Sequence, residues 1–263
     1  MRFAFGENWR AFALQALNSE RVEQGRRDFL ELLKGIELKG RSFLDIGFGQ
    51  GLALFYATEA GAQVFGVDID PVNEDALEHT RRFFPRCSKP DTRTASILDA
   101  KLVENLRQRG GFDIVYSWGA LHHTGNMWMA LDHSLALVRP EGYFVVALYN
   151  KHWTSRLWWF ERRFFNSSPP WARRVIVTAL YPVIYLAKWC VTGKNPMKKD
   201  RGMDFFYDVI DWLGGYPYEY ASAQRVTDYM AARGWVRQRL CAARVPTGCN
   251  EYVFRRGSQE TPG

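Results

Sequence analysis

A glycine-rich turn, followed by a carboxylate at the end of the next strand, is the part of this chain whose residue types are best suited to chemistry. The turn follows an apolar strand over 42–46, and its glycines are Gly47, Gly49 and Gly51. A helix and a second apolar strand over 63–67 come next, and that strand leads into Asp68. Glycines at this spacing let the backbone pass close to a ligand, and the helix directs its free N–H groups toward it. Since a carboxylate can accept two hydrogen bonds from a ribose diol, the unit is predicted to bind a nucleoside.

Asp45 lies two residues before the first glycine and indicates which nucleoside fits. A dinucleotide-binding turn reads G-x-G-x-x-G, whereas the glycines here are spaced G-x-G-x-G. A carboxylate at this position would repel a pyrophosphate but attract an ammonium group. S-adenosylmethionine (SAM) has an ammonium, a sulfonium and no phosphate. The sequence D-x-G-x-G-x-G followed by V-x-G-V-D therefore resembles the first two motifs of the class I SAM-dependent methyltransferases, which implies SAM as the cofactor.

Strand and helix patterns alternate over most of the chain and predict an α/β fold with a doubly wound, mostly parallel sheet. Strands are expected over 42–46, 63–67, 92–98, 112–118, 143–149, 235–242 and 250–255, with a turn at Arg139–Gly142. Helices are expected within 7–34 and over 50–60, 71–84, 101–109, 127–138 and 223–233. The motif order, with FDIVYSWGALHH and the R-P-E-G turn before the fifth strand, is similar to the branch that contains the ubiquinone-biosynthesis O-methyltransferases. That resemblance implies the seven-stranded Rossmann-like methyltransferase fold, in which the last strand is antiparallel.

The resemblance also implies which residues hold SAM. They are Asp45, Gly47, Gly49, Gly51, Asp68, Ile69, Ile97, Asp99 and Ser117. Asp45 would reach the ammonium as the glycine backbone passes the methionine moiety, and Asp68 would accept from both ribose hydroxyls. The two isoleucines would pack on adenine, and the backbone carbonyl near Ser117 would meet the ammonium. Asp99 would accept from the adenine amino group, or would instead cap the following helix.

Methyl transfer to a hydroxyl acceptor needs a base, and His122 and His123 are the candidates. The reaction is an in-line displacement at the sulfonium carbon, so the enzyme must align the acceptor with the methyl group and deprotonate it. Both histidines follow the fourth strand at the carboxyl edge of the predicted sheet, where such folds bind ligands. Histidine has a suitable pKa for this role. The alternative is that they form local hydrogen bonds where the chain enters a helix.

Polar residues at other strand ends are expected to face the same crevice and contact the substrate. They are Tyr149, Asn150, Tyr218 and Glu219. The N/D-P-P-Y pattern of enzymes that methylate nucleic-acid amino groups is absent after the fourth strand, where the chain reads S-W-G-A, and this argues against nucleic acid. We therefore expect methyl transfer to a small or lipid-like molecule at oxygen. N-methylation, an RNA substrate, or a membrane-associated SAM-binding protein without turnover are the alternatives.

Composition places the protein in a reducing compartment. The four cysteines form no C-x-x-C pair and no cluster with histidine, so we expect neither disulfides nor a structural metal. The first residues lack the apolar core of a signal peptide. The longest uncharged apolar run, Val175–Ala187, has 13 residues and falls short of the roughly 18 that span a bilayer. We expect a cytoplasmic protein, peripheral to the membrane if the basic segment described next contacts lipid.

An aromatic and basic insert is expected over 151–215, and it separates the two segments, 41–150 and 216–256, of a SAM-binding domain. Residues 1–40 would be a separate N-terminal helical segment. Residues 151–201 hold 11 Lys and Arg against two acidic residues, and six of the ten tryptophans lie between 151 and 213. This composition suits a lid over a bulky apolar acceptor, an anionic membrane surface or an RNA-binding patch. A helical dimer face is the remaining interpretation, so an oligomer stays open.

Overall fold

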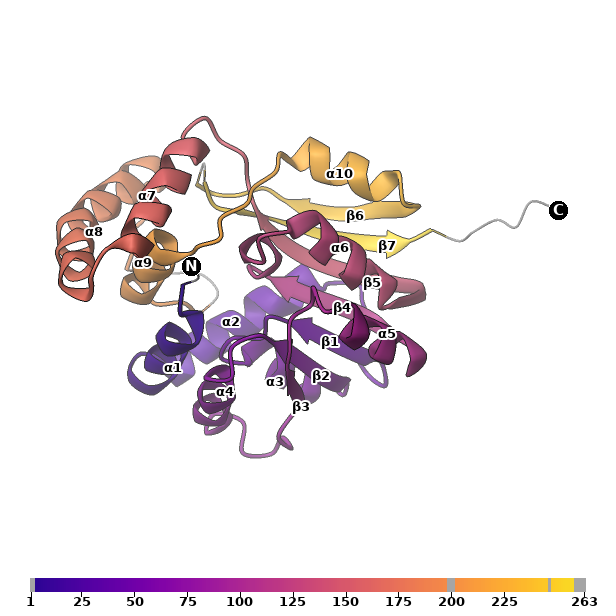
Figure 1. Ribbon diagram of the computed structural model, residues 1–263. Coiled ribbons are helices and arrows are strands. Elements are labelled where there is room, and N and C mark those ends of the chain that lie inside the picture. Colours follow the sequence, from indigo (N-terminus) through magenta and orange to yellow (C-terminus); the bar gives the residue numbers. More distant parts are fainter. Residues whose placement is uncertain (1–2, 198–201, 246, 258–263) are drawn as a thin grey trace.

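A mixed sheet forms the centre of the computed structural model, which describes residues 3–197, 202–245 and 247–257 (Figure 1). Its strands are β1 (Ser42–Ile46), β2 (Gln63–Asp68), β3 (Asp91–Thr94), β4 (Phe112–Trp118), β5 (Val138–Tyr149), β6 (Trp235–Cys241) and β7 (Cys249–Arg256). They lie in the order β3-β2-β1-β4-β5-β7-β6. The first five strands are parallel, and β7 is antiparallel to both of its neighbours. The predicted doubly wound, mostly parallel seven-stranded sheet is confirmed.

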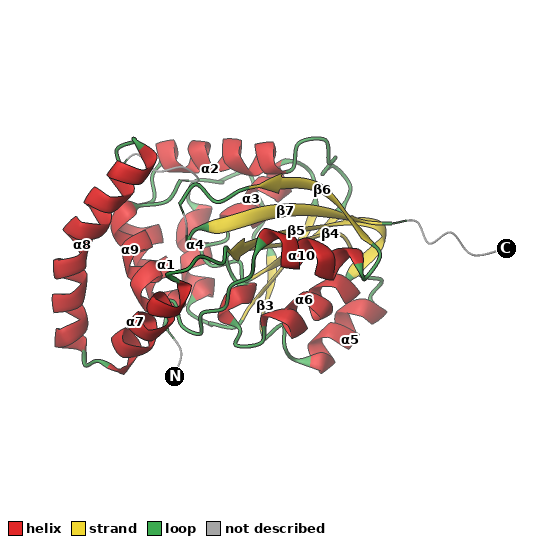
Figure 2. Ribbon diagram, turned by 90° about the horizontal axis from the view of Figure 1, so that it is seen from above, coloured by secondary structure: helices red, strands yellow, loops and turns green. Residues whose placement is uncertain are grey.

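Helices cover both faces of this sheet (Figures 1 and 2). They are α1 (Phe5–Gln15), α2 (Ser19–Leu32), α3 (Leu52–Glu59), α4 (Asn73–Arg81), α5 (Ala100–Gln108), α6 (Met127–Ala136), α7 (Ser155–Ser167), α8 (Pro170–Thr192), α9 (Phe205–Gly214) and α10 (Ala223–Ala231). Successive residues of β1 point to opposite faces, so Phe43 and Leu44 enter two separate apolar clusters and both are fully buried. Covering on both faces is what a parallel sheet requires.

The N-terminal helix α1 connects the sheet domain to the insert. It packs against α4 on one side and α9 on the other. The Gly6 amide donates to the Asp70 carboxylate at 3.0 Å. The Asn8 side chain donates to the Tyr207 carbonyl at 3.0 Å and to Asp211 Oδ1 at 2.7 Å. These contacts hold α1 beside the carboxyl edge of the parallel strands, where a ligand would enter.

The predicted helical insert after strand five is confirmed as α7, α8 and α9, which stand together beyond the carboxyl edge of the sheet (Figure 2). A small apolar cluster that includes Phe165, Ile184 and Leu213 joins these helices. Within α8, all of whose residues are described, only Ile184 is buried. By length and composition α8 could cross a membrane, with a mean hydropathy of 1.6 over its most apolar window. This corrects the expectation drawn from Val175–Ala187, because the helix extends beyond that run at both ends.

Other elements differ from the sequence prediction at their boundaries. β3 ends at Thr94, four residues earlier than expected, because this short edge strand pairs on one side only. β5 begins at Val138, so the expected turn at Arg139–Gly142 is an irregular part of that strand. The irregularity is visible in the backbone, since Glu141 adopts a positive φ of 58°. Helix α4 begins at Asn73 rather than Pro71.

Candidate active site

The glycine turn after β1 is shaped by backbone conformation and close packing. Gly47, Gly49 and Gly51 all have positive φ angles, which residues other than glycine rarely adopt. A Cβ at Gly47 would lie 2.2 Å from the Ala120 Cβ, and one at Gly51 would lie 2.0 Å from Leu77 Cδ1. Each glycine is therefore required by its own surroundings, and the first brings the turn against the segment that follows β4.

Asp45 lies beneath this turn as a buried carboxylate that lacks a counter-charge. Its side chain is 2% exposed, and Oδ1 has no hydrogen-bond partner among the described residues. Burial, with the charge of Asp68 adding to it, raises the pKa of Asp45 well above its ordinary value. Asp45 lines a small cavity of about 100 Å³ together with Gly47, Gly49 and Gln50. A cation placed there would stabilise the ionised carboxylate.

Asp68, at the end of β2, is held in a fixed orientation by backbone amides. Its Oδ2 accepts from the Gly49 amide at 3.1 Å, and its Oδ1 accepts from the Asp70 amide at 2.9 Å. Burial raises the pKa of Asp68, while these two hydrogen bonds and one from Asn73 oppose that change. After these three hydrogen bonds the carboxylate keeps acceptor capacity for a further one, and the side chain lines the large cavity described next.

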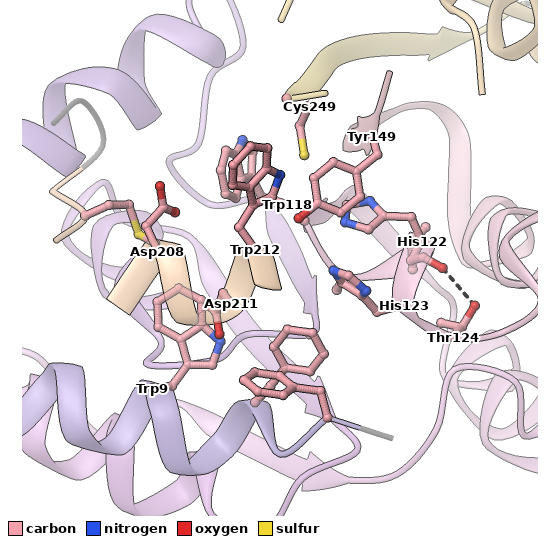
Figure 3. A pocket seen from close by; sticks show the side chains of 18 of the residues that line it. Trp9, Trp118, His122, His123, Thr124, Tyr149, Asp208, Asp211, Trp212 and Cys249 are labelled. Carbon is pink, nitrogen blue, oxygen red and sulfur yellow. Dashed lines mark hydrogen bonds between the residues drawn. The ribbon is translucent and has the colours of Figure 1, made fainter. Parts of the chain in front are cut away.

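A cavity of about 960 Å³ runs from Asp68 to the helices of the insert. One end is lined by Asp68, Ile69, Ser96, Ile97, Leu98 and Gly119, from the carboxyl ends of β2, β3 and β4. Aromatic side chains line much of the rest, among them Phe3, Phe5, Trp158 and Trp212, while Trp9 and Trp118 line both this cavity and the small cavity beside Asp45 (Figure 3). Asp208 and Asp211 of α9 add carboxylates to this apolar wall. A nucleoside-sized end and an apolar end thus belong to one continuous space.

His122 and His123 lie on a short 3₁₀ helix, Leu121–His123, at the middle of the cavity (Figure 3). His122 is 1% exposed, and the centroid of its ring lies 4.1 Å from the centroid of the Tyr149 ring. His122 Nδ1 has no hydrogen-bond partner among the described residues. Burial, then the charges of His123 and Arg162, lowers the pKa of His122 well below its ordinary value. A neutral imidazole with an open nitrogen can accept a proton.

His123 is already engaged through one nitrogen. Its Nδ1 lies 2.6 Å from the Pro217 carbonyl, and because a carbonyl only accepts, Nδ1 carries the proton of that hydrogen bond. Its ring also packs 4.7 Å from Phe5, between centroids. Of the two histidines, His122 is therefore the better candidate for a base.

A family model described as "Methyltransferase domain" matches residues 18–183, which is more than half of the chain. The chain belongs to this methyltransferase family. The ubiquinone biosynthesis O-methyltransferase of Rhodopseudomonas palustris (strain TIE-1) is 32% identical over 118 residues, covering 45% of this chain and 44% of the relative. The chain thus matches less than half the length of that curated relative. The corresponding protein of Nitrobacter winogradskyi is 31% identical over 119 residues, covering 45% of this chain and 42% of the relative.

Solved methyltransferase structures share the fold at low sequence identity. The magnesium protoporphyrin IX methyltransferase of Synechocystis PCC 6803, solved with bound SAM, superposes with a TM-score of 0.55 at 12% identity, covering 95% of this chain and 90% of that one. The sequence-based assignment to the SAM-dependent methyltransferases, and the similarity to the ubiquinone-biosynthesis branch, are confirmed at the level of family and fold.

The structure brings most of the expected cofactor residues together in this methyltransferase, with two differences. Asp99 does not line either cavity; its exposed side chain caps α5 by accepting from the Lys101 amide at 2.9 Å. Ser96, which does line the large cavity, lies closer to the expected adenine position. Ser117 is fully buried within β4, where its hydroxyl donates to the Ile46 carbonyl at 2.7 Å. Residues 118 and 119, just beyond it, line the cavity instead.

Of the expected substrate contacts, only Tyr149 lines the cavity. Asn150 accepts from the Asn250 amide group at 3.1 Å. The Glu219 carboxylate accepts from the Met127 amide at 2.9 and 3.1 Å and so caps α6 from a distant part of the chain. Tyr218 is 3% exposed and packs 5.1 Å from Tyr149, between ring centroids. These three residues support the wall and do not form it.

Sequence reasoning missed the contribution of the N-terminus and of α9. Phe3, Phe5 and Trp9 line the cavity, although the spacing around Trp9 indicated only an amphipathic helix. Asp208 and Asp211 also line it, yet nothing in the sequence separates them from ordinary surface acids. No group of three or more His, Cys, Asp or Glu side chains in the described part of the chain could hold a metal ion.

Proposed function

We propose that this methyltransferase transfers the methyl group of SAM to an oxygen of a small or lipid-like acceptor bound at the apolar end of the cavity. The observation that carries the proposal is continuity: Asp68, His122 and the aromatic wall line one space. SAM, when bound, supplies the electrophilic methyl group. The name of the relatives, ubiquinone biosynthesis O-methyltransferase, supports oxygen as the site of transfer.

The residues present fit SAM. The unpartnered Oδ1 of Asp45 suits the ammonium of the methionine moiety, and the Asp68 carboxylate keeps acceptor capacity for a ribose hydroxyl. Ile97 and Leu98 offer an apolar surface for adenine beside Ser96. A bound ammonium would also compensate the buried charge of Asp45, which destabilises the fold when it has no partner.

The chain's own contribution to the reaction is alignment and proton removal. Burial excludes water from His122, and its open Nδ1 can take a proton from an acceptor hydroxyl. The neighbouring Tyr149 ring fixes the orientation of the imidazole. No acid is needed on the other side, because the leaving sulfide is neutral.

The acceptor class follows from the wall opposite Asp68. Trp118, Trp158 and Trp212 with the N-terminal phenylalanines enclose an apolar volume large enough for an aromatic or prenyl-like group. Helix α8 adds Val183, Ile184 and Ala187 to the same wall. We propose that residues 151–215 act as a lid on the domain formed by 41–150 and 216–256, and that α1, which packs against α9, closes the cavity beside the lid.

The test is to supply radiolabelled SAM together with lipid and aqueous extracts of bacterial cells. Label that appears in a lipid-extractable product and resists hydroxylamine but is lost on ether cleavage supports O-methylation of a lipid-like acceptor. His122→Ala should bind SAM normally and transfer little label. Label found in RNA or on an amine would contradict the proposed acceptor class. If no fraction takes up label although SAM still binds, the protein binds SAM without turnover.

We propose in addition that the outer face of the insert contacts an anionic membrane surface. Large apolar side chains that do not line the cavity are exposed on α8 and on and before α7: Trp153, Leu157, Phe160, Phe164, Trp171, Val175, Leu186 and Trp189. The basic residues interleaved with them give 151–201 a net charge of +9. That charge favours anionic headgroups and disfavours a second copy of the same basic face. Since α8 also lines the cavity, a lipid-like acceptor would enter beside it.

Cosedimentation with vesicles tests this contact. The protein should pellet with vesicles containing phosphatidylglycerol, much less with pure phosphatidylcholine, and should be released as salt rises, since each basic residue near the surface contributes about 1 kcal/mol that salt screens. Protein that stays in the supernatant at low salt, or that self-associates in the absence of lipid, would make the insert a lid or an oligomer face only.

A further inference from the structure

Arg162 is a fully buried cation on α7 that the proposed function does not use. It is 0% exposed and is among the largest fully buried side chains of the protein. Both carboxylate oxygens of the adjacent Glu161 lack a hydrogen-bond partner in the described residues, so Glu161 attracts the Arg162 charge but makes no hydrogen-bonded ion pair with it. A buried charge without a counter-ion is costly unless other groups stabilise it. Such a residue therefore calls for an explanation.

Aromatic rings and one carbonyl take the place of a counter-ion. The Arg162 Cζ lies 3.8 Å from the centre of the Tyr218 ring and 4.8 Å from that of Tyr149. Its Nη1 donates to the Gly215 carbonyl at 3.1 Å. Asn166, one turn further along α7, donates to the Gly214 carbonyl at 2.6 Å and so attaches the same helix to the same loop. Cation–π contacts in a desolvated site are among the stronger ones.

The loop after α9 and the Tyr149 ring, both of which Arg162 touches, also hold the histidine pair. In the loop after α9, the Pro217 carbonyl accepts from His123 Nδ1 at 2.6 Å, and the Glu219 amide donates to the His122 carbonyl at 3.0 Å. Tyr149 packs on the His122 ring. A single side chain of the insert thus contacts both supports of the candidate base.

The charge of Arg162 acts on the same ring. The titratable and charged groups that face His122 are His123 from its own segment, Tyr149 from β5 and Arg162 from α7. After burial, the two positive or potentially positive neighbours disfavour the protonated imidazole. Tyr149 is buried too, which raises the pKa of its phenol and keeps it uncharged at neutral pH.

We propose that Arg162 is a positioning residue that fastens the helical insert to the loop and the Tyr149 ring that hold the histidine pair, and that places its positive charge beside the His122 ring. When α7 is docked, the base is both oriented and unprotonated; when α7 lifts away, both effects are lost together. The inference rests on the proposed role of His122. It assigns to the insert a part in the chemistry beyond that of covering the cavity.

Three substitutions separate the charge from the attachment. Arg162→Met removes both the charge and the donor, Arg162→Gln removes the charge but keeps a donor for the Gly215 carbonyl, and Arg162→Lys keeps the charge. The matched control is Arg163→Met, because Arg163 is the next residue of α7 and is exposed. The measurement is the titration of the His122 imidazole, followed by NMR on the full chain with labelled histidine and assigned with His122→Ala.

Arg162→Met and Arg162→Gln should each raise the midpoint of the His122 titration by about one pH unit, the scale of a neighbouring charge. Arg162→Lys and Arg163→Met should leave it near the wild-type value. Amide exchange in α7 should quicken in Arg162→Met more than in Arg162→Gln. A folded Arg162→Gln protein with an unchanged His122 midpoint would overturn the proposal, even if Arg162→Met fails to fold. Because the titration needs no acceptor, this outcome is distinct from a failure of methyl transfer.

Discussion

Replacing Asp68 by asparagine is the sharpest test of the cofactor site. The carboxylate accepts from the Gly49 amide at 3.1 Å and the Asp70 amide at 2.9 Å, and its remaining acceptor capacity is available to a ribose hydroxyl. Asn keeps the size of the side chain but removes the charge and one acceptor oxygen. Hydrogen bonds to a charged group contribute about 1.5–3 kcal/mol, so the Kd for SAM should rise about 10- to 150-fold. Isothermal titration calorimetry with SAM measures this directly.

Asp99→Asn is the matched control for that experiment. Its side chain is exposed and caps α5, and asparagine caps helices as well as aspartate does. SAM affinity and thermal stability should therefore be unchanged. If Asp68→Asn binds SAM as tightly as the wild type while remaining folded, the nucleoside is not held at the end of β2. If Asp99→Asn loses as much affinity as Asp68→Asn, the adenine contact expected from the sequence is restored and the capping role is secondary.

Three further predictions follow from buried and exposed groups. Asp45 has a raised pKa in the folded protein, so the folded state binds the proton more tightly than the unfolded state, and stability without SAM falls as pH rises above about 3.8. Asp45→Asn should therefore raise the melting temperature, measured by calorimetry, at pH 7 but not near pH 3. Equal effects at the two pH values would contradict this prediction. His122→Ala should lower turnover about 10²–10⁴-fold at unchanged SAM affinity. Because the pKa of His122 is lowered, the turnover of the wild-type enzyme should persist below pH 6.5. A pH profile in which turnover already falls at or above that pH would exclude His122 as the base. Leu186→Ser should leave the unfolding free energy within about 0.5 kcal/mol but weaken vesicle binding, whereas Ile184→Ala should destabilise the fold by about 2 kcal/mol or more; the reverse pattern would place the opposite face of α8 outward.

Local sequence was sufficient for much of the fold. Short continuous apolar runs placed β1, β2 and β4 within one residue, because a strand buried on both faces leaves such a run among neighbouring residues. The glycine turn and Asp68 were found for the same reason, since a positive φ and a strand-end carboxylate leave a short-range signal. The resemblance to the SAM-dependent methyltransferases starts from that same stretch, and the family model extends it to residues 18–183.

Asp99 shows where local information ends. Its S-I-L-D context fits both a strand end and a helix cap, and only the sheet decides, because β3 is an edge strand that stops pairing at Thr94 and leaves Asp99 to begin α5. Glu219 is a similar case: it caps α6 across 92 residues of sequence, a contact that no pattern in either segment announces.

The composition of the insert identified a special segment, but its role in the site depends on contacts between distant parts of the chain. Trp9 lines the cavity because α1 is held between α4 and α9, and Arg162 reaches Gly215 and Tyr149 because α7 docks on the carboxyl edge of the sheet. The sequence by itself determined the sheet, the glycine turn and the two carboxylates beside it, since turn chemistry and apolar runs are local. Tertiary structure alone decided which side chains close the cavity and which charge faces His122, because packing between helices far apart in the sequence fixes burial and proximity.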